Sequence, residues 1–368
     1  MRITCLISSL QLGGAERQLA GLAVLLGQAG HDVEVVTYRE GDFYAGELAA
    51  AGVAHTRLSP RGGFPALVRR IARHLRERGT DVVISFLVGA NIKACLAHII
   101  YPKFKLVVSE RNCNTILLPH DIFRFLLFQS HADAVVCNSF AQTAFVSRHC
   151  PGLRLKLETI PNFVDTDKFT PPTEPRQNVP GRPLRVVTVA RLRPRKNALG
   201  LIRAAADPSL SGVRFDWYGA VPGCGYARRC ASLIERLGLT GRFSIHPASK
   251  DPAALYREAD AFCLPSFYEG TPNSLAEALT AGLPAICSDV SDNARYVIPG
   301  RNGFLFNPHS HKSIAKALRK LAGLSSQSRA EYSAESLSIS AENFPKKLFV
   351  KRYVELLGGL DGGQKAKS

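Results

Sequence analysis

The chain has 368 residues, 46% of them hydrophobic, and a formal net charge of +17. This composition excludes a disordered protein, and the length fits two domains with separate hydrophobic cores. The nine cysteines are dispersed without C-x-x-C pairs or metal-ligand spacing, which excludes a disulfide framework and favours buried thiols in a reducing compartment. The basic charge extends along the whole chain, so nucleic acid, anionic lipid and phosphorylated substrates remain open as partners.

In the first half, short apolar runs alternate with helical patterns, which is typical of parallel sheets built from strand–helix–strand units. The first helix is expected over Ala15–Ala29. Arg61–Arg78 has the pattern of an amphipathic helix rich in arginine, and a second apolar helix contains Phe123–Phe128. The predicted strands are Arg2–Ser8, Asp32–Tyr38, Asp81–Phe86, Lys105–Ser109, Ala134–Asn138 and Leu157–Pro161.

A proline-rich segment, Thr170–Pro183, interrupts this alternation and predicts a linker, because proline at that density does not fit helices or central strands. The alternation resumes with a helix near Leu199–Ala206 and strands at Leu184–Ala190, Arg214–Tyr218, Phe243–His246, Ala261–Pro265, Pro284–Ser288 and Gly303–Phe306. The predicted organisation is a first domain over 1–169, the linker over 170–183, a second domain over 184–342, and a C-terminal helix that returns to the first domain, with a frayed tail, over 343–368.

Two motifs suit phosphate groups. Gly13 and Gly14 open the first helix, where glycine lets a phosphate approach unpaired backbone N–H groups, although a simple tight turn is an equal alternative. The spacing does not match G-x-G-x-x-G, so a nicotinamide cofactor is not expected. Arg191 and Lys196 follow the first strand of the second domain and suit a diphosphate, with a solvated basic turn as the alternative.

The most informative motif, PSFYEGTPNSLAEAL, runs from Pro265 to Leu279. Glu269 ends a loop, and Glu277 lies on a helix expected to start near Pro272. Two carboxylates so placed can accept hydrogen bonds from sugar hydroxyl groups, and backbone N–H groups around Gly270 suit a phosphate. The alternative is a helix-dipole role for Glu269 and a surface charge at Glu277, but the neighbours of Glu277 are apolar.

Five segments, taken in chain order, together resemble the retaining nucleotide-sugar glycosyltransferases of family 4. They are GGAERQLAGLAVLLGQAGHDVEVVT, TIPNFVDTDKFTP, VTVARLRPRKN, ADAFCLPSFYEGTPNSLAEALTAGLPAICSDV and GRNGFLFNP. The resemblance spans nearly the whole chain and implies an α/β GT-B fold, in which two Rossmann-like domains have parallel sheets facing across a cleft. The sequence S-E-R-N from Ser109 to Asn112 resembles the subgroup that acts on bacterial surface glycans, often with galactose or N-acetylhexosamine donors.

The resemblance also implies a role for each matching residue. Glu269 would contact the transferred sugar near its anomeric carbon, and Glu110 or Arg111 would face the acceptor. These three are the candidate catalytic residues. Glu277 would accept the ribose hydroxyls. The implied donor-binding set is Gly13, Gly14, Arg191, Lys196, Gly270, Thr271, Asn273, Ser274 and Glu277.

The family needs no metal or cofactor, so we expect none, and Asp165-x-Asp167 is interpreted as part of the segment that leaves the first domain. One family glutamate is replaced within Asn293-Ala294-Arg295-Tyr296, which leaves one sugar or nucleotide contact open.

The implied reaction moves a hexose or N-acetylhexosamine, with retention, from a nucleotide sugar to a lipid-linked or glycan acceptor in cell-surface polysaccharide synthesis. UDP is the default nucleotide and GDP the second choice. No segment reaches the roughly 20 apolar residues that span a bilayer. We therefore expect a cytoplasmic enzyme that is either soluble or peripheral on the inner membrane, where Arg61–Arg78 or Phe123–Phe128 would contact anionic lipid. The alternatives are an arginine-rich outer helix of a soluble domain for Arg61–Arg78 and, favoured over a membrane contact, a core helix under the sheet for Phe123–Phe128.

Two other functions stand as alternatives to a glycosyltransferase. An epimerase-like enzyme that modifies nucleotide sugars on the same fold is the main alternative. A nucleic-acid-binding protein is disfavoured, because zinc ligands, RNP-like aromatic residues and a helix-turn-helix signal are missing from the sequence.

Overall fold

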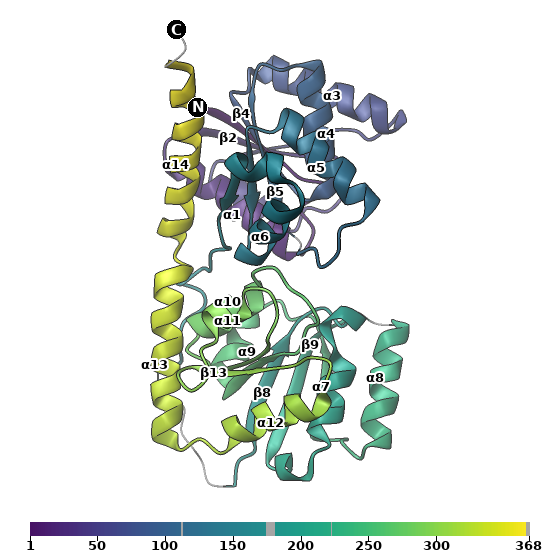
Figure 1. Cartoon of the computed structure of the whole chain (residues 1–368), viewed down its shortest axis with the longest axis vertical. Coiled ribbons are helices and arrows are strands. Elements are labelled where there is room, and N and C mark those ends of the chain that lie inside the picture. Colours follow the sequence, from purple (N-terminus) through teal and green to yellow (C-terminus); the bar gives the residue numbers. More distant parts are fainter. Residues whose placement is uncertain (112, 174–180, 222, 366–368) are drawn as a thin grey trace. The chain divides into compact units, whose positions relative to one another are not determined.

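The computed structural model describes residues 1–368 except 112, 174–180, 222 and 366–368. The chain divides into two compact units (Figure 1). Unit 1 comprises Met1–Asn162 with Lys346–Ser368, and unit 2 comprises Phe163–Pro345. Unit 2 thus begins ahead of the predicted linker, and half of that linker, residues 174–180, lies outside the described residues.

Unit 1 is built on a seven-stranded parallel sheet with the order β3-β2-β1-β4-β5-β6-β7. The prediction missed β3, because its four side chains are exposed or half-buried and leave no apolar run. The strands are β1 Arg2–Leu6, β2 Asp32–Thr37, β3 Ala54–Arg57, β4 Val82–Phe86, β5 Lys105–Glu110, β6 Ala134–Cys137 and β7 Leu157–Thr159.

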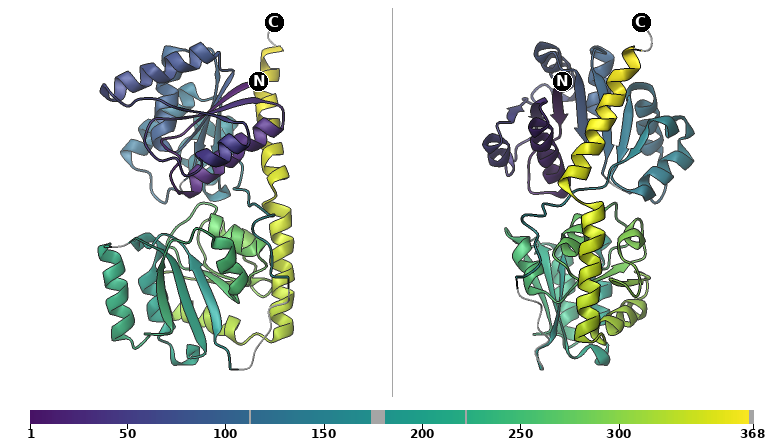
Figure 2. Two further views of the ribbon diagram at one scale, coloured as in Figure 1. Left: turned by 180° about the vertical axis from the view of Figure 1, so that it is seen from behind. Right: turned by 90° about the vertical axis from the view of Figure 1, so that its left-hand side faces the viewer.

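Helices cover both faces of this sheet. On one face, α3, α4 and α5 bury their apolar sides against strand residues such as Leu6 and Val108. On the other face, α14 packs beside α1 (Figure 2), and Tyr353 of α14 is fully buried. The helices are α1 Gly14–Gln28, α2 Ala45–Ala50, α3 Gly63–Arg78, α4 Val88–Ile100, α5 Pro119–His131, α6 Phe140–His149, the 3-10 helix η1 Pro151–Lys156 and α14 Lys346–Lys365.

Unit 2 has a six-stranded parallel sheet with the order β10-β9-β8-β11-β12-β13. Its strands β11 and β12 are buried along their whole length, as expected for a parallel sheet covered on both faces. The strands are β8 Leu184–Val189, β9 Val213–Ala220, β10 Phe243–Pro247, β11 Ala261–Leu264, β12 Ala285–Ser288 and β13 Gly303–Phe306. The parallel α/β architecture predicted from the alternating pattern is therefore confirmed in both units.

The two faces of the unit 2 sheet have separate cores. Helices α7, α8 and α12 pack on one face around Trp217, and α9, α10 and part of α13 pack on the other around Tyr256 and Phe262. The helices are η2 Pro194–Lys196, α7 Ala198–Ala205, η3 Pro208–Leu210, α8 Gly225–Arg236, α9 Pro252–Glu258, α10 Asn273–Thr280, α11 Asn293–Tyr296, α12 His311–Ala322 and α13 Ser326–Asn343.

The helix expected at the C-terminus is α14, which begins at Lys346, three residues after the predicted start, and belongs to unit 1. Helix α13 ends at Asn343, and Pro345 separates the two helices because proline interrupts helical hydrogen bonding. The predicted frayed tail begins later than expected, since α14 continues to Lys365.

The cysteine prediction is confirmed in the main. All nine thiols are free, and six of them are buried: Cys5, Cys95, Cys137, Cys230, Cys263 and Cys287. Burial raises the pKa of Cys5 to about 12, so this thiol stays protonated and behaves as a small apolar side chain.

Candidate functional site

The loop after β8 lies at the centre of the unit 2 sheet, where the strand order reverses between β8 and β11. It is anchored to β9, because the Trp217 indole N–H donates to the Ala190 carbonyl at 2.9 Å. Gly219 has a φ of 130°, and a Cβ there would lie 2.2 Å from the Ala190 oxygen. Only glycine allows this approach, which fixes the start of the loop carrying Arg191 and Lys196.

Lys196 and Glu269 form a buried ion pair. The Lys196 ammonium donates to Oε1 of Glu269, and the two side chains are 11% and 7% exposed. The Phe267 N–H donates to the Arg195 carbonyl at 2.9 Å, which joins the two loops that carry the pair. The structure therefore brings together the residues predicted to hold the donor diphosphate and the transferred sugar. A bound donor would share Lys196 with Glu269.

Glu277 lies on α10 and is 3% exposed, so the surface-charge alternative for it is wrong. Its Oε2 accepts a hydrogen bond from the Tyr256 hydroxyl at 2.9 Å. This bond holds one carboxylate oxygen in a fixed orientation. A fixed, buried carboxylate suits recognition of vicinal hydroxyl groups, because it accepts two hydrogen bonds without prior reorganisation.

The start of α10 carries the other predicted donor-binding residues. The helix begins at Asn273, close to the predicted start, with Pro272 at its N-cap and no described side chain capping it. Thr271 is buried, and Gly270, Asn273 and Ser274 are half-buried. Backbone N–H groups at a helix start attract anionic groups, so this segment has the chemistry for a phosphate.

Two buried polar atoms lie at the same edge of the sheet. Ser266 follows β11 and Asn293 follows β12, and each residue is 0% exposed. Within the described part of the chain, the Ser266 hydroxyl and the Asn293 Oδ1 have no hydrogen-bond partner. Buried polar groups are usually paired, so these atoms are sites where a ligand or a water would be favourable.

In unit 1, α1 begins at Gly14, one residue earlier than predicted, with Gly13 at its N-cap. No described side chain caps this helix start. A Cβ at Gly13 would lie 2.1 Å from the Glu16 carboxylate, so glycine leaves room for that carboxylate beside the first turn. This turn therefore remains a predicted phosphate-binding segment. It belongs to unit 1, whereas the other predicted donor-binding residues belong to unit 2.

Glu110, predicted to face the acceptor, belongs to a buried polar network instead of an open surface. It is 1% exposed. Oε2 of Glu110 pairs with the Arg124 guanidinium at 3.1 Å, and Arg124 also pairs with Asp121 at 2.9 Å. Asn91 donates to Oε1 at 3.3 Å. Burial raises the pKa of the Glu110 carboxyl, although the charge of Arg124 opposes this rise.

Arg111 joins β5 to the C-terminal helix. Its guanidinium lies 3.7 Å from the centroid of the Phe86 ring. The same group donates to Oδ1 of Asn162 at 2.9 Å and to the Tyr353 hydroxyl of α14 at 3.0 Å. These contacts give Arg111 a structural role, which stands beside its predicted catalytic one. The next residue of the S-E-R-N signature, Asn112, lies outside the described residues.

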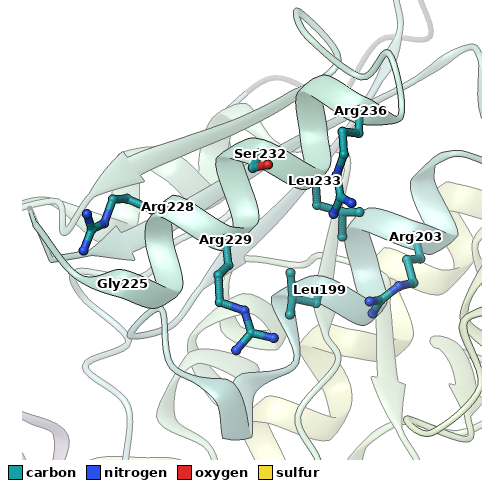
Figure 3. Close-up of a pocket in the computed structure, with 8 residues that line it drawn as sticks. All are labelled: Leu199, Arg203, Gly225, Arg228, Arg229, Ser232, Leu233 and Arg236. Carbon is teal, nitrogen blue, oxygen red and sulfur yellow. The ribbon is translucent and has the colours of Figure 1, made fainter.

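A hollow of about 560 Å³ lies elsewhere in unit 2, between α7 and α8 (Figure 3). Its lining contains no acidic residue and four exposed arginines: Arg203, Arg228, Arg229 and Arg236. In Figure 3 the side chains of Arg203 and Arg229 extend toward Leu199, while Arg228 points away from them. None of the predicted donor-binding residues lines this hollow, so it is a separate basic surface.

Over the described residues, no group of three or more His, Cys, Asp or Glu side chains is placed to hold a metal ion. In the same residues, no helix is both long and apolar enough to cross a bilayer.

The sequence motifs missed the residues that orient the site. Tyr256 holds Glu277, Trp217 holds the loop of Arg191, and the Ser291 hydroxyl donates to the Glu269 carbonyl. Each lies more than twenty positions from its partner in the sequence. No local pattern marks such a residue, because the contact exists only after the sheet has formed.

The fold and the site together define a GT-B glycosyltransferase. Two family models match the chain. The model described as "Glycosyltransferase Family 4" matches residues 12–168, and the model described as "Glycosyl transferases group 1" matches residues 171–336. Because the two models match the N-terminal and C-terminal domains in turn, the chain is a glycosyltransferase similar to family 4.

Known relatives agree with this assignment. The chain is 28% identical over 339 residues to the "GalNAc-alpha-(1->4)-GalNAc-alpha-(1->3)-diNAcBac-PP-undecaprenol alpha-1,4-N-acetyl-D-galactosaminyltransferase" of Campylobacter jejuni, with 86% of this chain and 88% of that protein covered. Among solved structures, Anabaena HepE in complex with UDP is similar with a TM-score of 0.84 and 22% identity, covering 98% of this chain and 100% of HepE.

A sucrose-phosphate synthase from Thermosynechococcus elongatus is similar with a TM-score of 0.83 at 17% identity, covering 98% of this chain and 99% of that protein. At such low identity, both structural likenesses establish the fold alone. They confirm the predicted GT-B class.

Proposed function

We propose that this glycosyltransferase transfers a hexose or N-acetylhexosamine, with retention of configuration, from a UDP-sugar to a lipid-linked glycan in cell-surface polysaccharide synthesis. The main observation in support is the set of charged groups near α10. Lys196 pairs with Glu269, four residues ahead of the helix, and the buried Glu277 lies on the helix itself, held by Tyr256. This set offers partners for the diphosphate, the sugar and the ribose of one donor molecule.

The chemistry follows from these partners. As the sugar–phosphate bond breaks, negative charge develops on the diphosphate. Lys196 and the N–H groups at the start of α10 stabilise that charge. Glu269 faces the sugar, where a carboxylate stabilises the positive charge that develops at the anomeric carbon. No metal is required for this charge balance.

The donor and acceptor classes are supported by relatives. HepE was solved with UDP, and the Campylobacter relative is named for a glycan on PP-undecaprenol. UDP-sugars therefore come first in the search for a donor, and polyprenyl-diphosphate glycans come first as acceptors. An epimerase-like reaction would appear as a changed sugar in a reaction that contains the donor alone.

The donor is tested by thermal stabilisation across a panel of nucleotide sugars. A ligand at 100 times its Kd raises stability by about 2.7 kcal/mol. The expected result is a shift with one UDP-sugar that is lost in Glu277→Ala and Lys196→Ala and kept in Lys250→Ala, an exposed lysine of unit 2. No shift with any nucleotide or nucleotide sugar would contradict the proposal.

The reaction itself is tested by product analysis. Proton NMR of the product should show the anomeric configuration of the donor, and an inverted product would overturn the retaining mechanism. Transfer should continue in the presence of EDTA. Loss of transfer that Mg²⁺ or Mn²⁺ restores would contradict metal independence.

Helices α3 and α5 are the elements that we propose to contact the membrane surface. Helix α3 buries Leu67, Val68, Ile71, Ala72 and Leu75 and leaves a stripe of arginines exposed at positions 69, 73 and 76. On α5, Phe125 and Phe128 are buried, as the core-helix interpretation predicts. However, Phe123 and Leu126 are 64% and 56% exposed. A basic stripe and exposed apolar side chains in one unit suit an anionic bilayer surface.

Flotation with phosphatidylglycerol vesicles tests this contact. Each basic residue near an anionic surface contributes about 1 kcal/mol, so the triple variant Arg69→Glu/Arg73→Glu/Arg76→Glu should lose flotation. The charge-matched control is Arg228→Glu/Arg229→Glu/Arg236→Glu on α8, which should still float. Equal loss in both variants would mean that overall charge, and not α3, drives binding.

A further inference from the structure

The Lys93 side chain lies at the carboxyl edge of the unit 1 sheet, outside every motif found in the sequence. The Lys93 ammonium, on α4, lies 4.7 Å from the centroid of the Tyr38 ring and 5.0 Å from that of the Phe64 ring. It donates to the Gly89 carbonyl at 3.0 Å. Tyr38, Phe64 and Lys93 come from the connections that follow β2, β3 and β4, so the cluster lies at the edge where parallel sheets bind ligands.

The surroundings of Lys93 are positively charged. Among the residues that the structure describes, no carboxylate forms an ion pair with it. Burial lowers the pKa of Lys93, and the nearby charge of Arg39 lowers it further. The Arg39 N–H is bonded to the carbonyl of Ser8, just after β1, at 2.8 Å, which fixes this residue beside the same edge. A half-buried ammonium that has no carboxylate partner is favourable to an approaching anion.

The backbone that presents Lys93 is strained. Leu87, in the turn between β4 and α4, has a φ of 74°, which is a rare conformation for a bulky side chain. Such residues cost about 1–3 kcal/mol and concentrate at binding sites, where the surrounding structure maintains them. Here the strained turn determines where α4 begins, and α4 positions the ammonium between the two rings.

We propose that Lys93 forms a phosphate-binding subsite for the acceptor, with the Phe64 ring beside it as an apolar surface for the adjoining sugar or lipid. The ammonium keeps two N–H donors for phosphate oxygens beyond the one bound to Gly89. Tyr38 is 3% exposed and supports Lys93, whereas Phe64 is 48% exposed and can meet a ligand.

This subsite rests on the proposed function, because it assigns the diphosphate of a lipid-linked glycan to unit 1 while the diphosphate of the donor belongs to unit 2. The two anions thus have separate cations. In this proposal Lys93 contacts the phosphate and not the reacting hydroxyl, so it contributes to binding and orientation and not to the chemical step.

The first experiment compares two acceptors, the same glycan with and without its polyprenyl diphosphate. Lys93→Met keeps an apolar stem against the two rings and removes the charge. It should raise KM for the diphosphate acceptor about 10- to 100-fold, the equivalent of one charge-assisted hydrogen bond, with kcat and the donor KM unchanged. KM for the acceptor that lacks the diphosphate should stay the same.

The control is Lys103→Met, an exposed lysine of the same unit, which should behave as wild type. The melting temperature of Lys93→Met should not fall, because the substitution removes a partly buried charge. A lower melting temperature with equal loss on both acceptors would make Lys93 a structural residue and overturn the subsite. So would unchanged kinetics on the diphosphate acceptor.

A binding experiment separates this inference from the proposed function. Geranyl diphosphate, a soluble prenyl diphosphate, should bind wild type more tightly than Lys93→Met by calorimetry, with UDP present in both titrations, and geraniol should bind neither. Inorganic pyrophosphate should show the same difference if the phosphate groups alone are recognised. If the enzyme transfers no sugar yet this difference holds, the proposed function fails and the subsite stands. Equal binding by both proteins overturns the subsite.

Discussion

At the carboxyl edges of the two sheets, the lysine side chains have different kinds of partner. In unit 2, the ammonium of Lys196 is paired with the carboxylate of Glu269. In unit 1, the ammonium of Lys93 is held by two aromatic rings and a carbonyl group, while the carboxylate of Glu110 is paired beneath the surface with Arg124. Similar sheets therefore offer different sites.

The difference indicates what each edge can bind. A paired cation at the unit 2 edge exchanges or shares its partner when an anion arrives, so binding there is selective and depends on the carboxylate. A cation between rings attracts any phosphate of suitable shape. The contrast matches a donor with several polar parts in unit 2 and a diphosphate anchor in unit 1.

The largest effect is expected from the Lys196–Glu269 pair. Lys196→Met should cost about 3–5 kcal/mol of unfolding free energy, because it leaves a buried carboxylate uncompensated. It should also lower kcat by about 10²- to 10³-fold, because it removes the group that we propose to stabilise the leaving diphosphate. Urea denaturation and steady-state kinetics measure the two effects.

The double variant Lys196→Met/Glu269→Gln separates the effect on stability from the effect on catalysis. It should recover stability relative to either single variant and remain inactive. Additive stability losses in the double variant would mean that the two residues do not interact in solution. Lys250→Met is the matched control and should change neither quantity.

The next effect concerns the Arg111 contacts in unit 1. Arg111→Met removes a guanidinium from the Phe86 ring and two hydrogen bonds, one of them to α14. It should cost about 2–3 kcal/mol, and Tyr353→Phe should cost about 1 kcal/mol. Hydrogen exchange should show faster exchange in α14 for both variants. A loss of kcat in Arg111→Met without any loss of stability would instead support the catalytic role predicted from the S-E-R-N signature.

A smaller effect is expected at Tyr256. Tyr256→Phe keeps the ring and removes the hydrogen bond to Glu277, which should raise the donor KM about 5- to 10-fold, equivalent to about 1–1.4 kcal/mol. Acceptor KM should not change. Tyr332→Phe on α13 is the control, because that ring belongs to unit 2 and packs against Phe304. An unchanged donor KM in Tyr256→Phe would remove Glu277 from the ribose site or show that its orientation does not matter.

The smallest effect is a pH dependence in unit 2. Burial alone would raise the pKa of Asp216, but hydrogen bonds from Arg185 and His246 outweigh this and hold it below its usual 3.8. The ionised carboxylate therefore stabilises the fold above about pH 4, and this contribution is lost as pH falls through the lower pKa of the folded state. Asp216→Asn should flatten the dependence of melting temperature on pH between about 5 and 3. The same slope in the variant would assign the acid sensitivity to another group.

The alternating apolar pattern predicted most of the architecture. A buried parallel strand needs an apolar run, and a helix that packs on it needs a periodic face, so both leave a local record in the sequence. Strand β3 left none, because its side chains are exposed or half-buried. The motif residues Lys196, Glu269 and Glu277 were found because each lies in a short segment that resembles a known family.

No local sequence pattern marks the residues that complete the sites, because their partners lie far away in the sequence. Tyr256 acquires its role only when α9 packs beside α10, and Lys93 only when three connections meet at one sheet edge. Burial of Glu110 depends on Arg124, and the position of Arg111 depends on Tyr353, far along the chain. The sequence by itself determined which segments form the sheets and which loops carry charge. The tertiary structure decided which charges are paired, because pairing depends on distances that only the assembled sheets create.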